Sequence, residues 1–79
     1  MARIEGGHPE GKRFFWRGME ILSSYELEQV VGQIETPEEA QEFLKLYREY
    51  TPHADRNIAY VAGRFDYEKM NKIYQLFGI

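Results

Sequence analysis

The sequence of 79 residues contains no cysteine, so neither a disulfide nor a thiolate metal site can stabilise its fold. It also lacks any run near the ~20 consecutive apolar residues that a membrane-spanning helix requires. Its first residues, MARIEGGHPEGK, have no apolar core of the kind found in signal peptides. We therefore predict a cytoplasmic protein with no membrane contact, whose stability comes from packing or from a partner.

Histidine is scarce as well, which limits the available catalytic chemistry. His8 lies among glycines and His53 follows Pro52 directly, and neither has a second ligand at helical spacing. Ser23 and Ser24 are explained by a helix start, and a chain this short would struggle to enclose a substrate. We predict that the protein is not an enzyme, with no catalytic residue, metal or cofactor.

Basic side chains are too few for general affinity to nucleic acid, since the formal net charge is −3. The charge is nevertheless uneven along the chain. Residues 1–17 contain four basic and two acidic groups, residues 18–50 contain two and eight, and residues 51–79 contain four and three. This distribution predicts an acidic surface between two mildly basic ends.

Helix signals are abundant, and the clearest helix spans residues 36–50. Thr36 and Glu39 form a capping box, and Pro37 suits the first helical position. Pro52 ends the helix because it disfavours the helical conformation in the residue before it. The apolar positions recur at helical spacing as one stripe, formed by Ala40, Phe43, Leu44 and Tyr47.

A second helix is predicted just before it, over residues 24–34. Ser23 and Glu26 repeat the capping box, and Leu22 with Leu27 fits a hydrophobic staple. Only two residues connect this helix to the next one. We therefore predict that the two helices pack as an antiparallel or sharply angled pair.

The last helix is predicted to begin after Asp66, which can cap it, and to end at Phe77. Phe65 and Met70 fit a second staple, and Gly78 suits a left-handed cap. Residues 54–62 before it fit two structures. Their alanines favour a helix that ends in a left-handed cap at Gly63, whereas alternating apolar residues over 57–62 also fit a strand.

The segment RFFWRGMEIL, residues 13–22, is ambiguous too. Phe15, Met19 and Leu22 fit a helical stripe, but the aromatic content and the alternation favour extended chain. A tight turn at Arg17 and Gly18 would produce a short hairpin, which is stable only if it lies on the helices. Between these possibilities, we favour extended or irregular chain over the core.

Taken together, these signals predict an all-α fold. It consists of a flexible tail at residues 1–12 and one small domain at 13–79, a compact bundle of three to four short helices with an aromatic N-terminal segment. If both ambiguous segments are strands, the fold becomes a small α+β domain with a hairpin at 13–22 and a strand at 57–62.

The aromatic and basic cluster at residues 12–17 is the most suggestive functional signal. Three consecutive rings cannot all face one core, so at least one is predicted to be partly exposed. Because tryptophan, tyrosine and arginine anchor protein interfaces, we predict Phe14, Phe15 and Trp16 as apolar anchors, with Arg13 and Arg17 at the rim. The alternatives are that the rings only cover the core, or that they bind single-stranded nucleic acid.

The acidic helical face completes this hypothesis, because a charged surface speeds encounter and excludes wrong partners. Its predicted binding residues are Glu38, Glu39 and Glu42. The sequence thus predicts a protein–protein interaction module: an adaptor, inhibitor or small accessory subunit that docks on a larger protein. Homodimerisation is an equally physical use of the surplus aromatic surface.

A helix-turn-helix protein is the alternative function. Ala59, Gly63 and Phe65 provide the small residue, the turn glycine and the hydrophobe of that motif. Against it, Asp66 and Glu68 stand where phosphates would approach. The nucleic-acid-binding residues would be Lys69, Asn71, Lys72 and Gln75.

Overall fold

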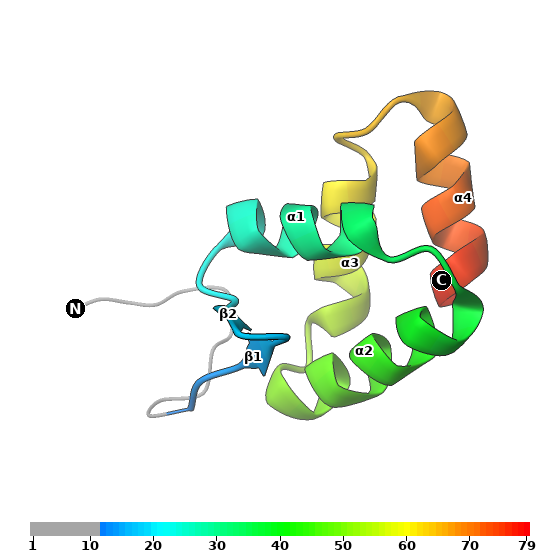
Figure 1. Cartoon of the computed structure of the whole chain (residues 1–79). Helices are drawn as coiled ribbons and strands as arrows, with labels where there is room; N and C mark the ends of the chain where they lie inside the picture. Colours follow the sequence, from blue (N-terminus) through cyan, green and yellow to red (C-terminus); the bar gives the residue numbers. More distant parts are fainter. Residues whose placement is uncertain (1–11) are drawn as a thin grey trace.

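A short hairpin precedes four helices in the computed structural model, which describes residues 12–79 (Figure 1). The elements are β1 (Phe15–Trp16), β2 (Met19–Glu20), α1 (Ser24–Gln33), α2 (Pro37–Tyr50), α3 (Ala54–Ala62) and α4 (Tyr67–Phe77). The predicted all-α bundle is confirmed, and residues 57–62 are helical rather than a strand. Apart from Lys12, the predicted tail at 1–12 lies outside the described residues.

The aromatic segment is extended chain over the core, as favoured, and it takes the form of the short hairpin that the turn at Arg17 and Gly18 allows. Phe15 pairs with Glu20 and Trp16 with Met19 in an antiparallel ladder. Arg17 and Gly18 form the turn, with φ angles of 52° and 85°. Positive φ at both positions gives a turn whose twist matches that of the strands.

The inner side of the hairpin is fixed by rings on α2. Phe14 lies with its ring centroid 5.4–5.6 Å from those of Phe43, Tyr47 and Tyr50, and Trp16 lies 5.1 Å from Phe43. Phe14 and Trp16 are only 8% and 9% exposed. A two-stranded ladder is marginal alone, so this packing is what stabilises it.

The predicted start of α1 is confirmed, whereas that of α2 is modified. The Ser23 hydroxyl and the Glu26 carboxylate complete the capping box of α1. The Thr36 hydroxyl accepts from the backbone N–H of Glu39 at 3.2 Å, as predicted. The Glu39 carboxylate, however, forms an ion pair with Arg17 of the hairpin turn. In α2 the Glu39 carboxylate therefore pairs with Arg17 rather than completing the capping box by accepting from the backbone N–H of Thr36.

The two glycine caps differ from one another. Gly78 is left-handed with φ of 70°, as predicted, but Gly63 is right-handed with φ of −68°, so the prediction of a left-handed cap there is wrong. The chain instead continues past α3 in tight right-handed turns, because the N–H groups of Arg64 and Phe65 donate to the carbonyls three residues earlier. No left-handed residue is needed at that point.

Figure 1 shows α1 and α2 running in opposite directions, as the short connection predicts. Each nevertheless packs mainly on later helices, α1 on α3 and α2 on both α3 and α4. A side chain reinforces the last contact: Gln41 Nε2 donates to the carbonyls of Leu76 and Phe77 at 3.3 and 3.0 Å. The first two helices are therefore held together largely by the chain that follows them.

Candidate functional site

The hairpin has an outward side that the bundle does not cover. Because side chains alternate along strands, Arg13, Phe15, Glu20 and Leu22 face away from the core, and we call them the outer hairpin face. Phe15 is 51% exposed and Leu22 is 64% exposed. The predicted staple therefore leaves most of Leu22 in solvent. Two large apolar side chains are thus available on this face.

An ion pair whose guanidinium is mostly in solvent also lies on this face. Arg13 donates from Nε and Nη2 to the two carboxylate oxygens of Glu20, at 2.8 and 3.0 Å. The same guanidinium lies 5.2 Å from the centroid of the Phe15 ring, within the range of a cation–π contact. Hydrogen bonding from Arg13 lowers the pKa of Glu20, so the ion pair persists at neutral pH. An aromatic ring beside an arginine combines two residue types that are enriched at protein interfaces.

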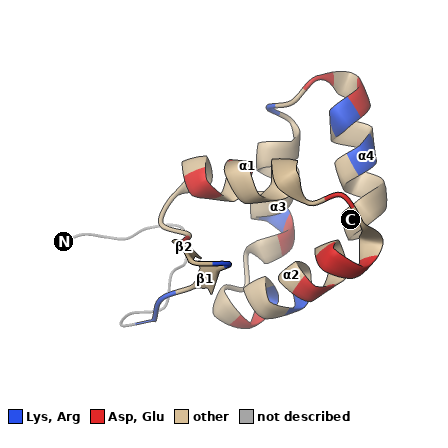
Figure 2. Ribbon diagram, viewed as in Figure 1, with Lys and Arg blue, Asp and Glu red and all other residues tan. Residues whose placement is uncertain are grey.

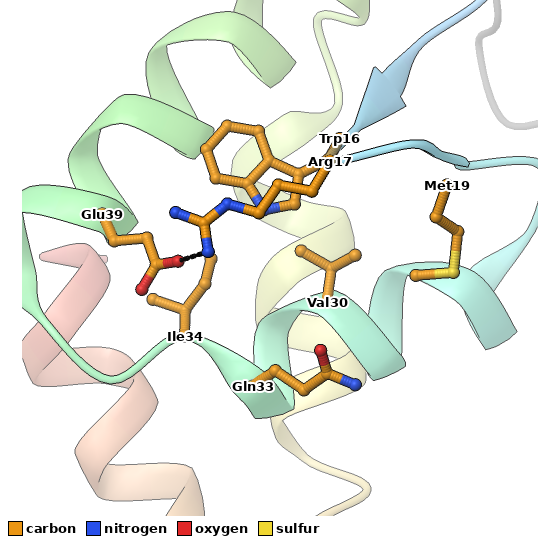
Figure 3. A pocket seen from close by; sticks show the side chains of 7 residues that line it. All are labelled: Trp16, Arg17, Met19, Val30, Gln33, Ile34 and Glu39. Carbon is orange, nitrogen blue, oxygen red and sulfur yellow. Dashed lines mark ion pairs between the residues drawn. The ribbon is translucent and has the colours of Figure 1, made fainter.

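A pocket of about 140 Å³ opens beside the hairpin turn, on the opposite side of the hairpin from this face (Figure 3). Three segments that are distant in sequence line it: the turn, the end of α1 with the residue after it, and the first turn of α2. The lining residues are Trp16, Arg17, Met19, Val30, Gln33, Ile34 and Glu39.

An ion pair forms the polar edge of this pocket. The Arg17 side chain crosses the Trp16 indole, 5.2 Å from its centroid, and ends at the Glu39 carboxylate (Figure 3). The Arg17 side chain is 66% exposed, whereas that of Glu39 is only 19% exposed. The carboxylate is therefore part of the pocket wall, while the guanidinium lies mostly in solvent.

The structure separates the three predicted aromatic anchors. Phe14 and Trp16 belong to the core, as the alternative interpretation of the cluster expects for them. The reason is strand alternation, which turns positions 14 and 16 towards α2 and position 15 away from it. Phe15 is exposed, in agreement with the prediction that at least one of the three rings is partly exposed. Arg13 and Arg17 are both engaged in ion pairs within the chain.

The predicted acidic residues also divide. Glu38 and Glu42 are exposed on α2, and the ribbon of Figure 2 is coloured red for acidic residues along the first half of this helix. Glu39 is turned towards the hairpin instead. Of the three predicted acidic residues, Glu39 therefore lines the pocket, whereas Glu38 and Glu42 lie in solvent.

The residues of the helix-turn-helix alternative lie on α4. Lys72 and Gln75 are exposed, whereas Lys69 and Asn71 are half-buried. In Figure 1 the chain rises through α3 and returns through α4, which packs beside it. This arrangement resembles an αα-hairpin more than the steep crossing of a helix-turn-helix.

Within residues 12–79, no group of three histidine or acidic side chains could hold a metal ion. In the same part of the chain, the helices are too short or too polar to cross a membrane. The pocket is also smaller than the 300–1,000 Å³ typical of small-molecule sites, so it suits a single side chain better than a substrate.

Sequence reasoning missed two parts of this site. Met19, Val30, Gln33 and Ile34 meet only after the hairpin has folded onto the helices, and the sequence contains no local signal for that contact. Glu20 and Leu22 could have been found, because the alternation that exposes Phe15 continues across the turn to both of them.

Comparison with known proteins adds no relative. No protein-family model matches the chain, and no curated protein or solved structure is significantly similar to it.

Proposed function

We propose that the chain is a non-enzymatic protein-interaction module, an adaptor, inhibitor or small accessory subunit, that docks on a larger protein through the outer hairpin face. The observation that carries this proposal is the exposed Phe15 ring, which lies on the outer hairpin face beside the Arg13 guanidinium. Aromatic rings and arginine are the side chains that most often dominate binding energy at interfaces.

The arrangement of the face before binding supports a docking role. Phe14 and Trp16 hold the hairpin backbone on α2, and the Arg13 guanidinium lies over the Phe15 ring. Because the hairpin backbone is already in place, this chain loses less entropy when a partner covers Phe15.

The acidic side chains of α2 supply a second, weaker contribution. Glu38 and Glu42 are exposed and can attract a partner with a basic surface during diffusional encounter. Charges of this kind mainly raise the association rate and reject acidic competitors.

The test is site-specific photo-crosslinking in the cells that express the chain. The photoreactive phenylalanine analogue p-benzoylphenylalanine at position 15 keeps a ring on the outer hairpin face, and the control places it at Tyr67, which is 75% exposed on α4. We expect one larger protein to be captured from position 15 and not from position 67. Crosslinks to a second copy of the chain would instead assign this face to a homodimer.

The captured protein then allows a quantitative measurement. Phe15→Ala should weaken binding about 30-fold in calorimetry, on the order expected of an interface hot spot, while Tyr67→Ala leaves it unchanged. Equal affinities for both variants would contradict docking through the hairpin.

A further inference from the structure

We infer that the pocket beside the hairpin turn takes a lysine or arginine side chain from a basic segment of the partner. This inference rests on the proposed function and adds the chemistry of the partner. It concerns the pocket side of the hairpin and does not involve Phe15 or Leu22.

The lining of the pocket suits the shape of a long basic side chain. Val30 and Ile34 of the α1 end, together with Trp16 and Met19 of the hairpin, form apolar walls, and Glu39 stands at one edge (Figure 3). Lysine and arginine combine an apolar stem with a charged head, so they match walls of this kind. A volume of about 140 Å³ admits one such side chain.

Charge favours a cation over an anion or a neutral group. α1 ends at the pocket with the negative end of its dipole, and its last turn contains no basic residue. Glu39 belongs to the pocket wall, and Glu35 and Glu38 are exposed close to it in sequence. Arg17 is the basic side chain among the lining residues.

Arg17 occupies in the free chain the position that the partner's cation would take. Its guanidinium lies over Trp16 and pairs with Glu39. Because that guanidinium is mostly in solvent, the ion pair contributes little and can open at small cost. Arg17 is therefore an internal competitor, and its removal should raise the affinity of the pocket for another cation.

Two blocked amino acids test this directly. They are Nα-acetyl-lysine methylamide, which keeps its ε-ammonium group, and Nα-acetyl-norleucine methylamide, which has a similar stem without the charge. Titrations of the full chain are followed by ¹H–¹⁵N spectra, in which the indole N–H of Trp16, the sole tryptophan, reports on the pocket. We expect saturable shifts at Trp16, Val30 and Ile34, with the lysine probe binding at least fivefold more tightly than norleucine.

Three variants sharpen the result. Glu39→Gln should abolish the preference for lysine, whereas Glu68→Gln makes the same charge change on α4 and should preserve it. Arg17→Met should tighten lysine binding at least threefold. The dispersion of each spectrum shows whether the variant is folded.

Equal affinity for norleucine would overturn the inference, as would weaker lysine binding by Arg17→Met or the lack of any saturable shift. None of these results affects docking through Phe15, since the crosslinking experiment does not use the pocket. Conversely, if no protein is crosslinked from position 15, the proposed docking function is wrong, even if the lysine probe binds in the pocket.

Discussion

The two halves of the core are built from different side chains. Where the hairpin meets α2 the contacts are between rings, whereas α1, α3 and α4 meet mainly through aliphatic side chains. The rings are Phe14, Trp16, Phe43, Tyr47 and Tyr50, and the principal aliphatic residues are Leu27, Val30, Val31, Ile34, Ile58, Val61, Ile73 and Leu76.

The difference follows from the amount of chain that each element offers. β1 and β2 contain two residues each, so they can place only a few side chains on the core. An aromatic side chain buries 150–250 Å², which allows a very short element to gain enough contact. Helices of nine to fourteen residues reach the same result with many smaller groups. The hairpin should therefore be far more sensitive than the helices to the loss of one residue.

The largest expected effect comes from neighbouring positions on the two sides of the hairpin. Trp16→Ala should lower the free energy of unfolding by about 3 kcal/mol, because a large buried ring is replaced by a cavity. Phe15→Ala should change it by about 0.5 kcal/mol or less, since its ring lies largely in solvent. Urea denaturation followed by circular dichroism measures both.

Similar losses in these two variants would contradict the register of the hairpin. A shift of one residue would exchange the sides on which Phe15 and Trp16 lie.

A smaller effect should distinguish rings from aliphatic packing. Phe43 is fully buried and its ring lies 5.1–6.4 Å from those of Phe14, Trp16, Tyr47 and Phe77. Phe43→Leu keeps an apolar side chain but removes all four ring contacts, so we expect a loss of about 2 kcal/mol. Ile58→Val in the aliphatic half should cost about 1 kcal/mol. If Phe43→Leu proved the milder change, ring geometry would contribute little beyond apolar volume.

The smallest effect concerns the aromatic ring that lies against α1. A Cβ atom at Gly32 would come within 3.0 Å of the Phe65 ring. In a free helix, glycine to alanine gains up to about 1 kcal/mol. Because the ring must move aside, we expect Gly32→Ala to change stability by about 0.5 kcal/mol or less in either direction. In a Phe65→Leu background the full helix gain should appear, and its absence there would show that the ring is not the obstacle.

The helices could be predicted from the sequence because their signals are local. Ser23, Thr36 and Asp66 each accept from a backbone N–H of the first turn, and α2, α3 and α4 end at the predicted residues. The packing could not be predicted in the same way. Thr36 and Glu39 have the spacing of a capping box, yet Glu39 forms an ion pair with Arg17, which lies 22 positions earlier. No signal in the sequence near Glu39 predicts this long-range contact.

The candidate site was predictable to the same extent. Adjacent rings must face different ways, so one exposed ring in the cluster at residues 14–16 followed from chain geometry alone. Which ring it is depends on whether the segment is a strand and on which side meets α2. The pocket depends on three distant segments, so it could only be found in the folded chain.

The turn residue Arg17 has a consequence for evolution and engineering. Its φ of 52° lies in the left-handed region, which glycine and asparagine adopt readily and which costs arginine conformational energy. A selection for heat resistance alone is therefore expected to replace it, since the hairpin would close more readily. That replacement would remove the ion pair with Glu39, so other cations could bind its carboxylate without competition from Arg17. The strain at Arg17 thus accompanies its ion pair with Glu39: a residue that fits the turn better would leave that carboxylate without this charge partner.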